Sequence, residues 1–305
     1  MTFLQIRQRI AELMGLSSID TTPDDNANMQ DKLKAWVNNR YKALAAKRSW
    51  NWLVKDSIVQ TTPDVTTGTV TATNGSTALI FSNPILPADV QGYFIQIQDT
   101  TDWYEVISAS DTSHAVMDVP FLGLTSGTYT FTLRKFYYLL PADTGKILDV
   151  SQHRIWNTAL KFVPARILDQ YLTYRQQTNR PRYYTIIGIN ATRQYKMELF
   201  PYPNVAMNLN VRRYQVVTEL SGDTDIPVIP EAYHEILVWD VLGTYGYTFL
   251  DDTRLSSAKA EFNILYQDMI HNDVATENIP VRLAFDVDLS GFNNVLGQYN
   301  LPVQP

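Results

Sequence analysis

The sequence predicts an α+β fold, in which a helical domain carries a small inserted antiparallel β-barrel or sandwich and an extended C-terminal arm. Two observations predict it: apolar residues recur every three to four positions towards both ends of the chain, and they alternate every second position in between. We expect four segments: 1–54 (N-terminal helical segment), 55–140 (inserted β-module), 141–273 (a mixed segment whose β-meander and C-terminal αα-hairpin complete the helical domain) and 274–305 (the arm).

Composition and charge limit the classes of protein. The 305 residues are 45% hydrophobic and 18% charged, which is typical of a folded protein. A net charge of −6 argues against a protein that grips a nucleic-acid backbone, and the absence of cysteine excludes disulfides and thiol chemistry. No apolar run is long enough to span a membrane and no signal peptide is recognisable, so we expect no membrane partner and synthesis in the cytoplasm.

The first two elements should be amphipathic helices. Thr2 can cap the first, whose apolar face carries Phe3, Ile6 and Ile10. The second is marked by a longer set with helical spacing, followed by two tryptophans expected to clamp it: Met29, Leu33, Trp36, Val37, Arg40, Tyr41, Leu44, then Trp50 and Trp52.

After these helices the apolar residues recur at every second position, as in β-strands. Asn74-Gly75 separates the runs 68–73 and 76–81, which predicts a hairpin with a type I′ turn. Further alternating runs at 93–98, 103–110 and 128–136, with turn residues between them, predict the barrel or sandwich. Three later runs read as the strands of a meander: 181–190, 193–203 and 207–220.

The strongest helical signal lies at 231–249. Between Ile236 and Leu242 this segment is apolar almost all round, so it is either buried on several sides or placed in a subunit interface. A following helix over 253–270 would complete an αα-hairpin with it. Residues 274–305 lack a helical period and predict an extended arm that needs another surface.

Catalytic and metal-binding patterns are weak. His234-Glu235 begins a zinc motif, but Val238 stands where the second histidine is required. The pairs Asp223/Asp225 and Asp286/Asp288 could hold Mg²⁺, yet this spacing is also ordinary turn chemistry. We therefore predict no enzyme, no cofactor and no metal; a hydrolase would need a convergent polar pocket that the sequence does not reveal.

Basic residues occur as pairs, at 47–48, 180–182 and 212–213. Arginines interleaved with tyrosines at 180–184 could stack on single-stranded nucleic acid, but the acidic balance of the chain disfavours that interpretation.

The order of the parts carries a resemblance. SWNWL, GTVTATNGSTALIF, the alternating runs, YYLLPAD and IPVIPEAYHEILVWDVLGTYG follow one another in an order similar to that of the head-to-tail adaptor (connector) proteins of short-tailed, podovirus-type double-stranded DNA bacteriophages, of the tail-tubular A and portal-adaptor types. The resemblance spans residues 1–273. It implies that the protein is a structural virion protein at the head–tail junction. It also implies that the helical domain is ring-forming, and the ring generally has twelve subunits.

The resemblance also implies the partners. They would be further copies of the chain, the portal protein and the tail nozzle, tube or other tail proteins, with DNA passing through the lumen without specific binding. Aromatic residues are the candidates for the interfaces, each of which could equally be a core residue: Trp36, Trp50, Trp52, Trp239, Tyr245, Phe262 and Phe285. The alternative function is a receptor- or carbohydrate-binding tail protein that displays Trp103 and Tyr104, although strand alternation sends these two side chains to opposite faces.

Overall fold

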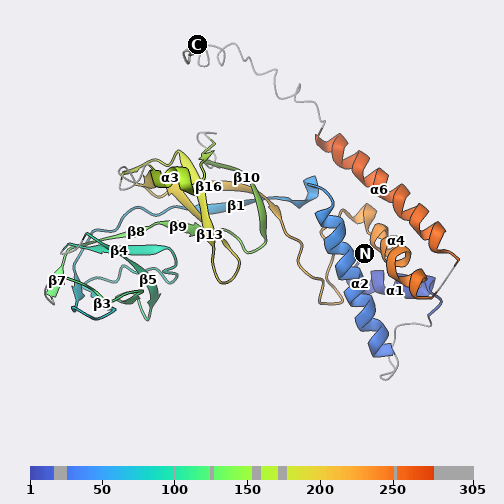
Figure 1. Cartoon of the computed structure of the whole chain (residues 1–305), viewed down its shortest axis with the longest axis horizontal. Helices are drawn as coiled ribbons and strands as arrows, with labels where there is room; N and C mark the ends of the chain where they lie inside the picture. The colour runs from blue at the N-terminus through green and yellow to red at the C-terminus, as the bar shows by residue number, and fades with distance from the viewer. Residues whose placement is uncertain are drawn as a thin grey trace, which may run out of the picture. The chain divides into compact units, whose positions relative to one another are not determined.

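The chain divides into two compact units. A computed structural model describes residues 1–16, 26–98, 101–123, 127–152, 159–170, 177–250 and 253–277. One unit combines both ends of the chain, Met1–Leu53 and Val217–Pro305, and the other is the continuous stretch Val54–Val216. The described part of the first unit is helical, and the second is built mainly of strands (Figure 1).

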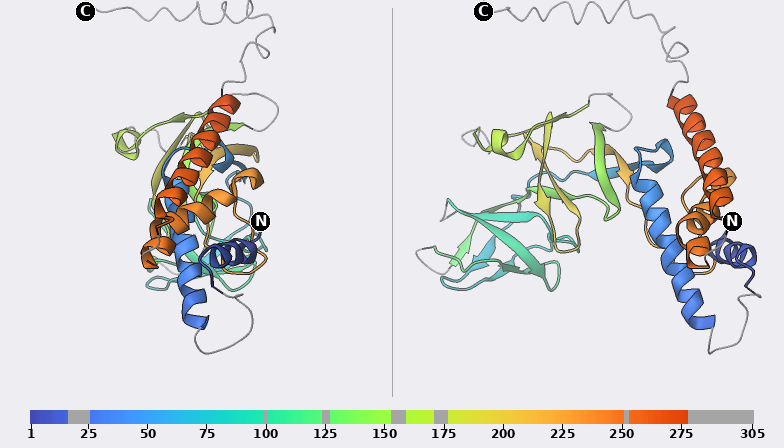
Figure 2. Two further views of the ribbon diagram at one scale, coloured as in Figure 1. Left: turned by 90° about the vertical axis from the view of Figure 1, so that its right-hand side faces the viewer. Right: turned by 45° about the vertical axis from the view of Figure 1, so that its right-hand side comes forward.

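The helical unit is a bundle around one short buried helix. Figures 1 and 2 show α2 and α6 alongside α4, and α1 also packs on α4. Its elements are α1 (Phe3–Leu13), α2 (Asn26–Ala46), η1 (Asn51–Leu53), η3 (Glu231–Tyr233), α4 (Glu235–Val241), the π-helical turn η4 (Leu242–Gly246), α5 (Tyr247–Phe249) and α6 (Leu255–Glu277).

Helical spacing places the predicted apolar faces inside the bundle. α1 begins with a capping box, in which Thr2 and Gln5 satisfy each other's backbone N–H groups. The fully buried residues of α1 and α2 follow the expected period: Phe3, Ile6, Ile10, Leu33, Val37, Tyr41 and Leu44. The described side chains of α6 that are buried, Ala258, Met269 and Asp273, share one face.

The helix α4 is buried by its own chain. Five apolar residues from Ile236 to Leu242 have no exposed surface, since α1, α2 and α6 surround them. Of the two interpretations of this all-apolar segment, burial on several sides is therefore correct. The predicted single helix over 231–249 is interrupted by the π-helical turn, where Gly246 lies so close to Met14 that an added Cβ would be 3.2 Å from its sulfur.

A seven-stranded antiparallel sheet forms the first part of the β unit. Its order is β7-β2-β3-β6-β5-β4-β8, and because only Thr130 separates its two outermost strands along the chain, the sheet is nearly closed into a barrel. Its strands are β2 (Val70–Ala72), β3 (Ala78–Phe81), β4 (Tyr93–Ile97), β5 (Trp103–Ala109), β6 (His114–Met117), β7 (Gly127–Tyr129) and β8 (Phe131–Lys135).

The predicted hairpin is present in this barrel. β2 and β3 pair antiparallel, with Val70 opposite Phe81. Gly75 has a φ of +79°, but Asn74 is not among the residues with positive φ, so the turn is not of type I′, which needs positive φ at both positions. Inward residues alternate along the strands and form one core, which includes Leu79, Phe81, Ile95, Tyr104, Phe131 and Leu133.

The remaining strands build three further sheets. One has the order β1-β16-β10, one β11-β13-β14-β9, and β12 pairs with β15. Their bounds are β1 (Val54–Gln60), β9 (Tyr137–Leu139), β10 (Thr144–Gln152), β11 (Lys161–Phe162), β12 (Thr178–Asn179), β13 (Tyr183–Ile189), β14 (Tyr195–Phe200), β15 (Tyr202–Pro203) and β16 (Asn208–Gln215); a short helix, α3 (Ala165–Gln170), follows β11.

The predicted fold class is wrong. Strands run from Val54 to Gln215 in four sheets, so the chain is mostly β and is not a helical ring-forming domain with a small inserted barrel. The predicted meander is also wrong: β13 pairs with β14, but β16 pairs with β1 and β10. The helix α6 continues to Glu277, and the rest of the predicted arm, 278–305, lies outside the described residues.

The β unit is entered and left through neighbouring strands. β1 begins at Val54, directly after Leu53 of the helical unit, and β16 ends just before Val217 returns to it. These two strands are paired antiparallel, with Val54 opposite Tyr214. The ends of the inserted unit therefore lie side by side, as is usual for a domain inserted into another.

Candidate functional site

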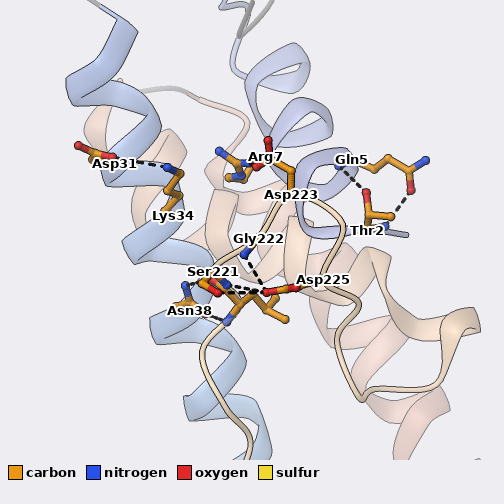
Figure 3. A network of polar contacts seen from close by, with 11 residues as sticks. Thr2, Gln5, Arg7, Asp31, Lys34, Asn38, Ser221, Gly222, Asp223 and Asp225 are labelled. Carbon is orange, nitrogen blue, oxygen red and sulfur yellow. Dashed lines mark hydrogen bonds and ion pairs between the residues drawn. The ribbon is translucent and has the colours of Figure 1, made fainter.

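The aspartates that suggested a metal site hold a loop instead. Figure 3 shows Asp223 beside the guanidinium of Arg7, which is itself 2% exposed. The carboxylate of Asp225 accepts hydrogen bonds from the backbone N–H groups of Gly222 and Ser221, and these two donors hold the pKa of Asp225 below its usual value. Asp223 and Asp225 thus stabilise the loop that leads into the C-terminal helices. The second candidate pair, Asp286/Asp288, lies outside the described residues.

The same loop is tied to both N-terminal helices. Its carbonyl oxygens at Asp225 and Asp223 accept from the first N–H groups of α1, at Phe3 (2.7 Å) and Leu4 (3.1 Å). On α2, Asn38 both donates to the carbonyl of Leu220 (2.9 Å) and accepts from its N–H (2.8 Å). These contacts join the two ends of the chain into one helical unit.

His234 is a structural residue of this unit. Its ring is 2% exposed, with Nε2 2.8 Å from the carbonyl oxygen of Ile229 and Nδ1 2.6 Å from the amino group of Met1. Because a carbonyl can only accept, Nε2 carries the proton and Nδ1 accepts from the amine. Burial lowers the pKa of the imidazole. Among the described residues, no group of histidines and carboxylates is arranged to hold a metal ion.

The aromatic interface candidates gather in two places within the helical unit. Trp36 and Tyr245 stack with ring centroids 5.5 Å apart, and both are half-buried. Trp50 is fully buried, stacks on Trp52 and meets the edge of Tyr266.

Phe262 extends the second group. It stacks on Tyr266 at 5.5 Å, and the ammonium of Lys47 lies 4.6 Å above its ring. Trp239 is half-buried on α4, and Phe285 lies outside the described residues. These contacts are all within the chain, so the aromatic side chains have structural roles whatever they contact in an assembly.

Two polar pairs, each with a buried aspartate, were not among the predicted site residues. Arg40 of α2 binds both carboxylate oxygens of Asp240 on α4, at 2.9 and 2.8 Å. Asn51 donates its backbone N–H and side-chain amide to Asp273 of α6, each at 3.0 Å. The sequence did indicate the first pair: Asp240 is an acidic residue inside an otherwise apolar helical run, and a buried carboxylate there needs a partner.

In the β unit, Arg134 is the centre of a polar and aromatic junction. It forms a bidentate ion pair with Asp64 at 2.9 and 2.6 Å and lies over the rings of Trp103 (5.1 Å) and Tyr202 (5.0 Å). Trp103 belongs to the barrel and Tyr202 to a different sheet, so Arg134 links the two. Trp103 is half-buried there and Tyr104 is 2% exposed, so these two rings do not form an exposed aromatic platform.

A basic cleft opens on another part of the β unit. Its volume is about 470 Å³, and its lining includes Lys161, Arg180, Arg182 and Tyr183. The three basic side chains are exposed and the described lining contains no acidic residue. The pair Arg180/Arg182 was visible in the sequence; Lys161 joins it because its N–H donates to the carbonyl of Arg182 across β11 and β13 (2.9 Å).

The comparison with known families identifies the chain. None of the described helices combines the length and hydropathy needed to cross a membrane. A search of curated proteins finds no match. The family model for the SU10 adaptor protein matches residues 114–283, more than half of the chain, from β6 through the later sheets and the C-terminal helices. The chain belongs to the SU10 adaptor protein family and is a phage adaptor, a structural component of the virion.

Proposed function

We propose that copies of this chain form a ring of twelve subunits at the head–tail junction of a short-tailed, podovirus-type phage. The ring would bind the portal protein on one side and the tail nozzle, tube or other tail proteins on the other. The genome would pass through its channel without specific binding. The single observation that carries the proposal is the adaptor family match over residues 114–283.

Two features of the molecule support a role in assembly. Each unit exposes surface of its own, such as the basic cleft in the β unit and Ile264 of α6, which is 57% exposed. The net charge of −6 favours passage of DNA over retention of it.

The aromatic candidates for interfaces remain part of this proposal. Five of them are half-buried and have surface left for a neighbour: Trp36, Trp52, Trp239, Tyr245 and Phe262. Trp50 is fully buried and would act only by holding the helical unit together. Receptor or carbohydrate binding, the alternative function, has no support from Trp103 and Tyr104, whose rings pack within the β unit.

Electron microscopy of the purified protein mixed with its phage portal tests the proposal. We expect twelve-fold rings stacked on the portal in negative stain. The matched control is a Trp50→Ala variant, which should unfold the helical unit and give bare portals. A protein that stays monomeric beside the portal, and binds glycans instead, would overturn the adaptor-ring function.

A further inference from the structure

Charge is strongly segregated along this chain. Between residues 150 and 197 there are eight of the 25 basic residues and, in Asp169, one of the 31 acidic residues, a net charge of +7. Since the whole chain carries −6, the remainder carries −13. The basic cleft described above lies inside this stretch, so its cations are surrounded in sequence by further cations and not by neutralising acids.

The cleft presents its cations to a partner. Lys161, Arg180 and Arg182 are exposed, and none of them is in an ion pair with a described residue. Arginine guanidinium groups bind carboxylates or phosphates through two parallel hydrogen bonds. The adjacent ring of Tyr183 adds a partly apolar wall. This surface is suited to an anionic partner that also carries apolar atoms.

A matching surface exists on α6 of the same chain. Glu261, Ile264 and Asp268 are three and four residues apart, so they share one helix face. All three are exposed, and neither carboxylate is in an ion pair with a described residue. The segment from residue 217 onwards is acidic as a whole, with fourteen acidic and three basic residues.

We propose that the basic cleft of one copy receives the Glu261–Ile264–Asp268 face of α6 from the neighbouring copy. The inference rests on the proposed ring: two different surfaces of one chain that fit each other make a head-to-tail contact, and such a contact gives a ring when the rotation between subunits closes. Charge complementarity would set the register of the subunits and make assembly sensitive to salt.

A phosphodiester backbone is the competing occupant of the cleft. The net charge of −13 outside the basic stretch repels DNA at long range, whereas the acidic α6 face is present in every copy at the same concentration as the cleft. The chain therefore supplies its own complementary surface, and DNA binding becomes an outcome that the experiment must distinguish.

Charge reversal tests the contact. One variant carries Lys161→Glu, Arg180→Glu and Arg182→Glu, and the other carries Glu261→Lys and Asp268→Lys. We expect the fraction of protein that sediments as rings to fall at least tenfold for each variant alone, measured by sedimentation velocity, because like charges then meet at every contact. An equimolar mixture should restore rings, since alternating subunits again place opposite charges together. Lys32→Glu with Lys55→Glu, both exposed positions outside the two surfaces, is the matched control.

The possible results distinguish a failure of this contact from a failure of the proposed ring. Circular dichroism checks that each variant is folded. If the wild type forms rings and the single variants do so equally well, the contact is wrong while the ring stands. If cleft reversal leaves rings intact but weakens binding of a short DNA duplex at low salt, the cleft binds phosphodiester and the proposal is overturned. A wild type that never forms rings, with or without portal, refutes the proposed function and this contact with it.

Discussion

Arg40 and Asp240 connect two helices that are 200 positions apart in sequence through two hydrogen bonds of 2.9 and 2.8 Å. The Asp240 side chain is 5% exposed and that of Arg40 is 20% exposed, so the pair is largely removed from water. It joins α2, from the N-terminal segment, to α4, from the C-terminal segment. The helical unit is thus held together by a charge pair as well as by its apolar core.

Removing one member of this pair should be costly. Arg40→Leu leaves a buried carboxylate without its partner, and we expect the free energy of unfolding to fall by about 3–5 kcal/mol in urea denaturation. The double variant Arg40→Leu/Asp240→Leu should recover part of that loss. Arg9→Ala, which removes exposed pairs with Glu12 and Glu235, is the control and should change stability by about 0.5 kcal/mol. A loss below about 1 kcal/mol for Arg40→Leu would contradict the buried-pair account.

Two neighbouring tryptophans should respond differently to the same substitution. The indole N–H of Trp50 donates to the carbonyl of Leu44 (2.9 Å), whereas that of Trp52 is buried and meets no acceptor among the described residues. Trp50→Phe should therefore lower the free energy of unfolding by about 1–3 kcal/mol, because it removes that donor. Trp52→Phe should be neutral within about 0.5 kcal/mol or stabilising, since it removes an unsatisfied group. Equal losses, measured by circular dichroism in urea, would contradict this assignment.

Arg134 should not be replaceable by lysine. Arg134→Ala leaves Asp64 unpaired and should lower the free energy of unfolding of the β unit by about 3–5 kcal/mol. Lysine keeps the charge but lacks the planar fork between Trp103 and Tyr202, so we expect it to restore only part of this. Arg212→Lys, at an exposed pair with Asp56, serves as control and should cost less than about 1 kcal/mol. Full rescue by lysine, seen in thermal unfolding, would show that the stacking contributes nothing.

His234 should make the helical unit less stable in acid. Burial lowers the pKa of its imidazole in the folded state below the ordinary value of 6.5. The unfolded chain then binds a proton more readily than the folded one, so this contribution to stability is full above about pH 6.5 and is lost as the pH falls from there through the lower pKa of the folded state. Protonation would also place a cation beside the amino group of Met1. The destabilisation between pH 7.5 and 5 should shrink in His234→Gln; an unchanged pH profile would exclude His234 as its cause.

Local patterns predicted most of the individual elements. The hairpin around Asn74-Gly75 and the barrel strands at 93–97 and 103–109 depend on alternation and turn residues that lie within a few positions of each other. The pairing of β16 with β1 could not be predicted in this way, because it joins Val54 to Tyr214 across most of the chain. That long-range pairing places residues 208–215 in the β unit, whereas the sequence had assigned them to a meander that completes the helical domain.

The surfaces were harder to predict than the elements. An apolar helix such as α4 gives the same pattern whether its own chain or a neighbour buries it, and only the packing of α1, α2 and α6 distinguishes these cases. The basic cleft likewise needs Lys161 to be carried next to Arg182 by strand pairing. The tryptophans were recognisable as important, but the sequence could not separate the buried Trp50 from the half-buried Trp36.

The most direct test of the adaptor function is a cryo-electron microscopy map of the head–tail junction in the intact virion. We expect twelve copies of this chain directly below the portal, with density that fits the helical bundle and the β unit of each copy and with the lumen open to DNA. A map in which that layer is built from another protein, or in which this chain occurs only at tail fibres, would contradict it.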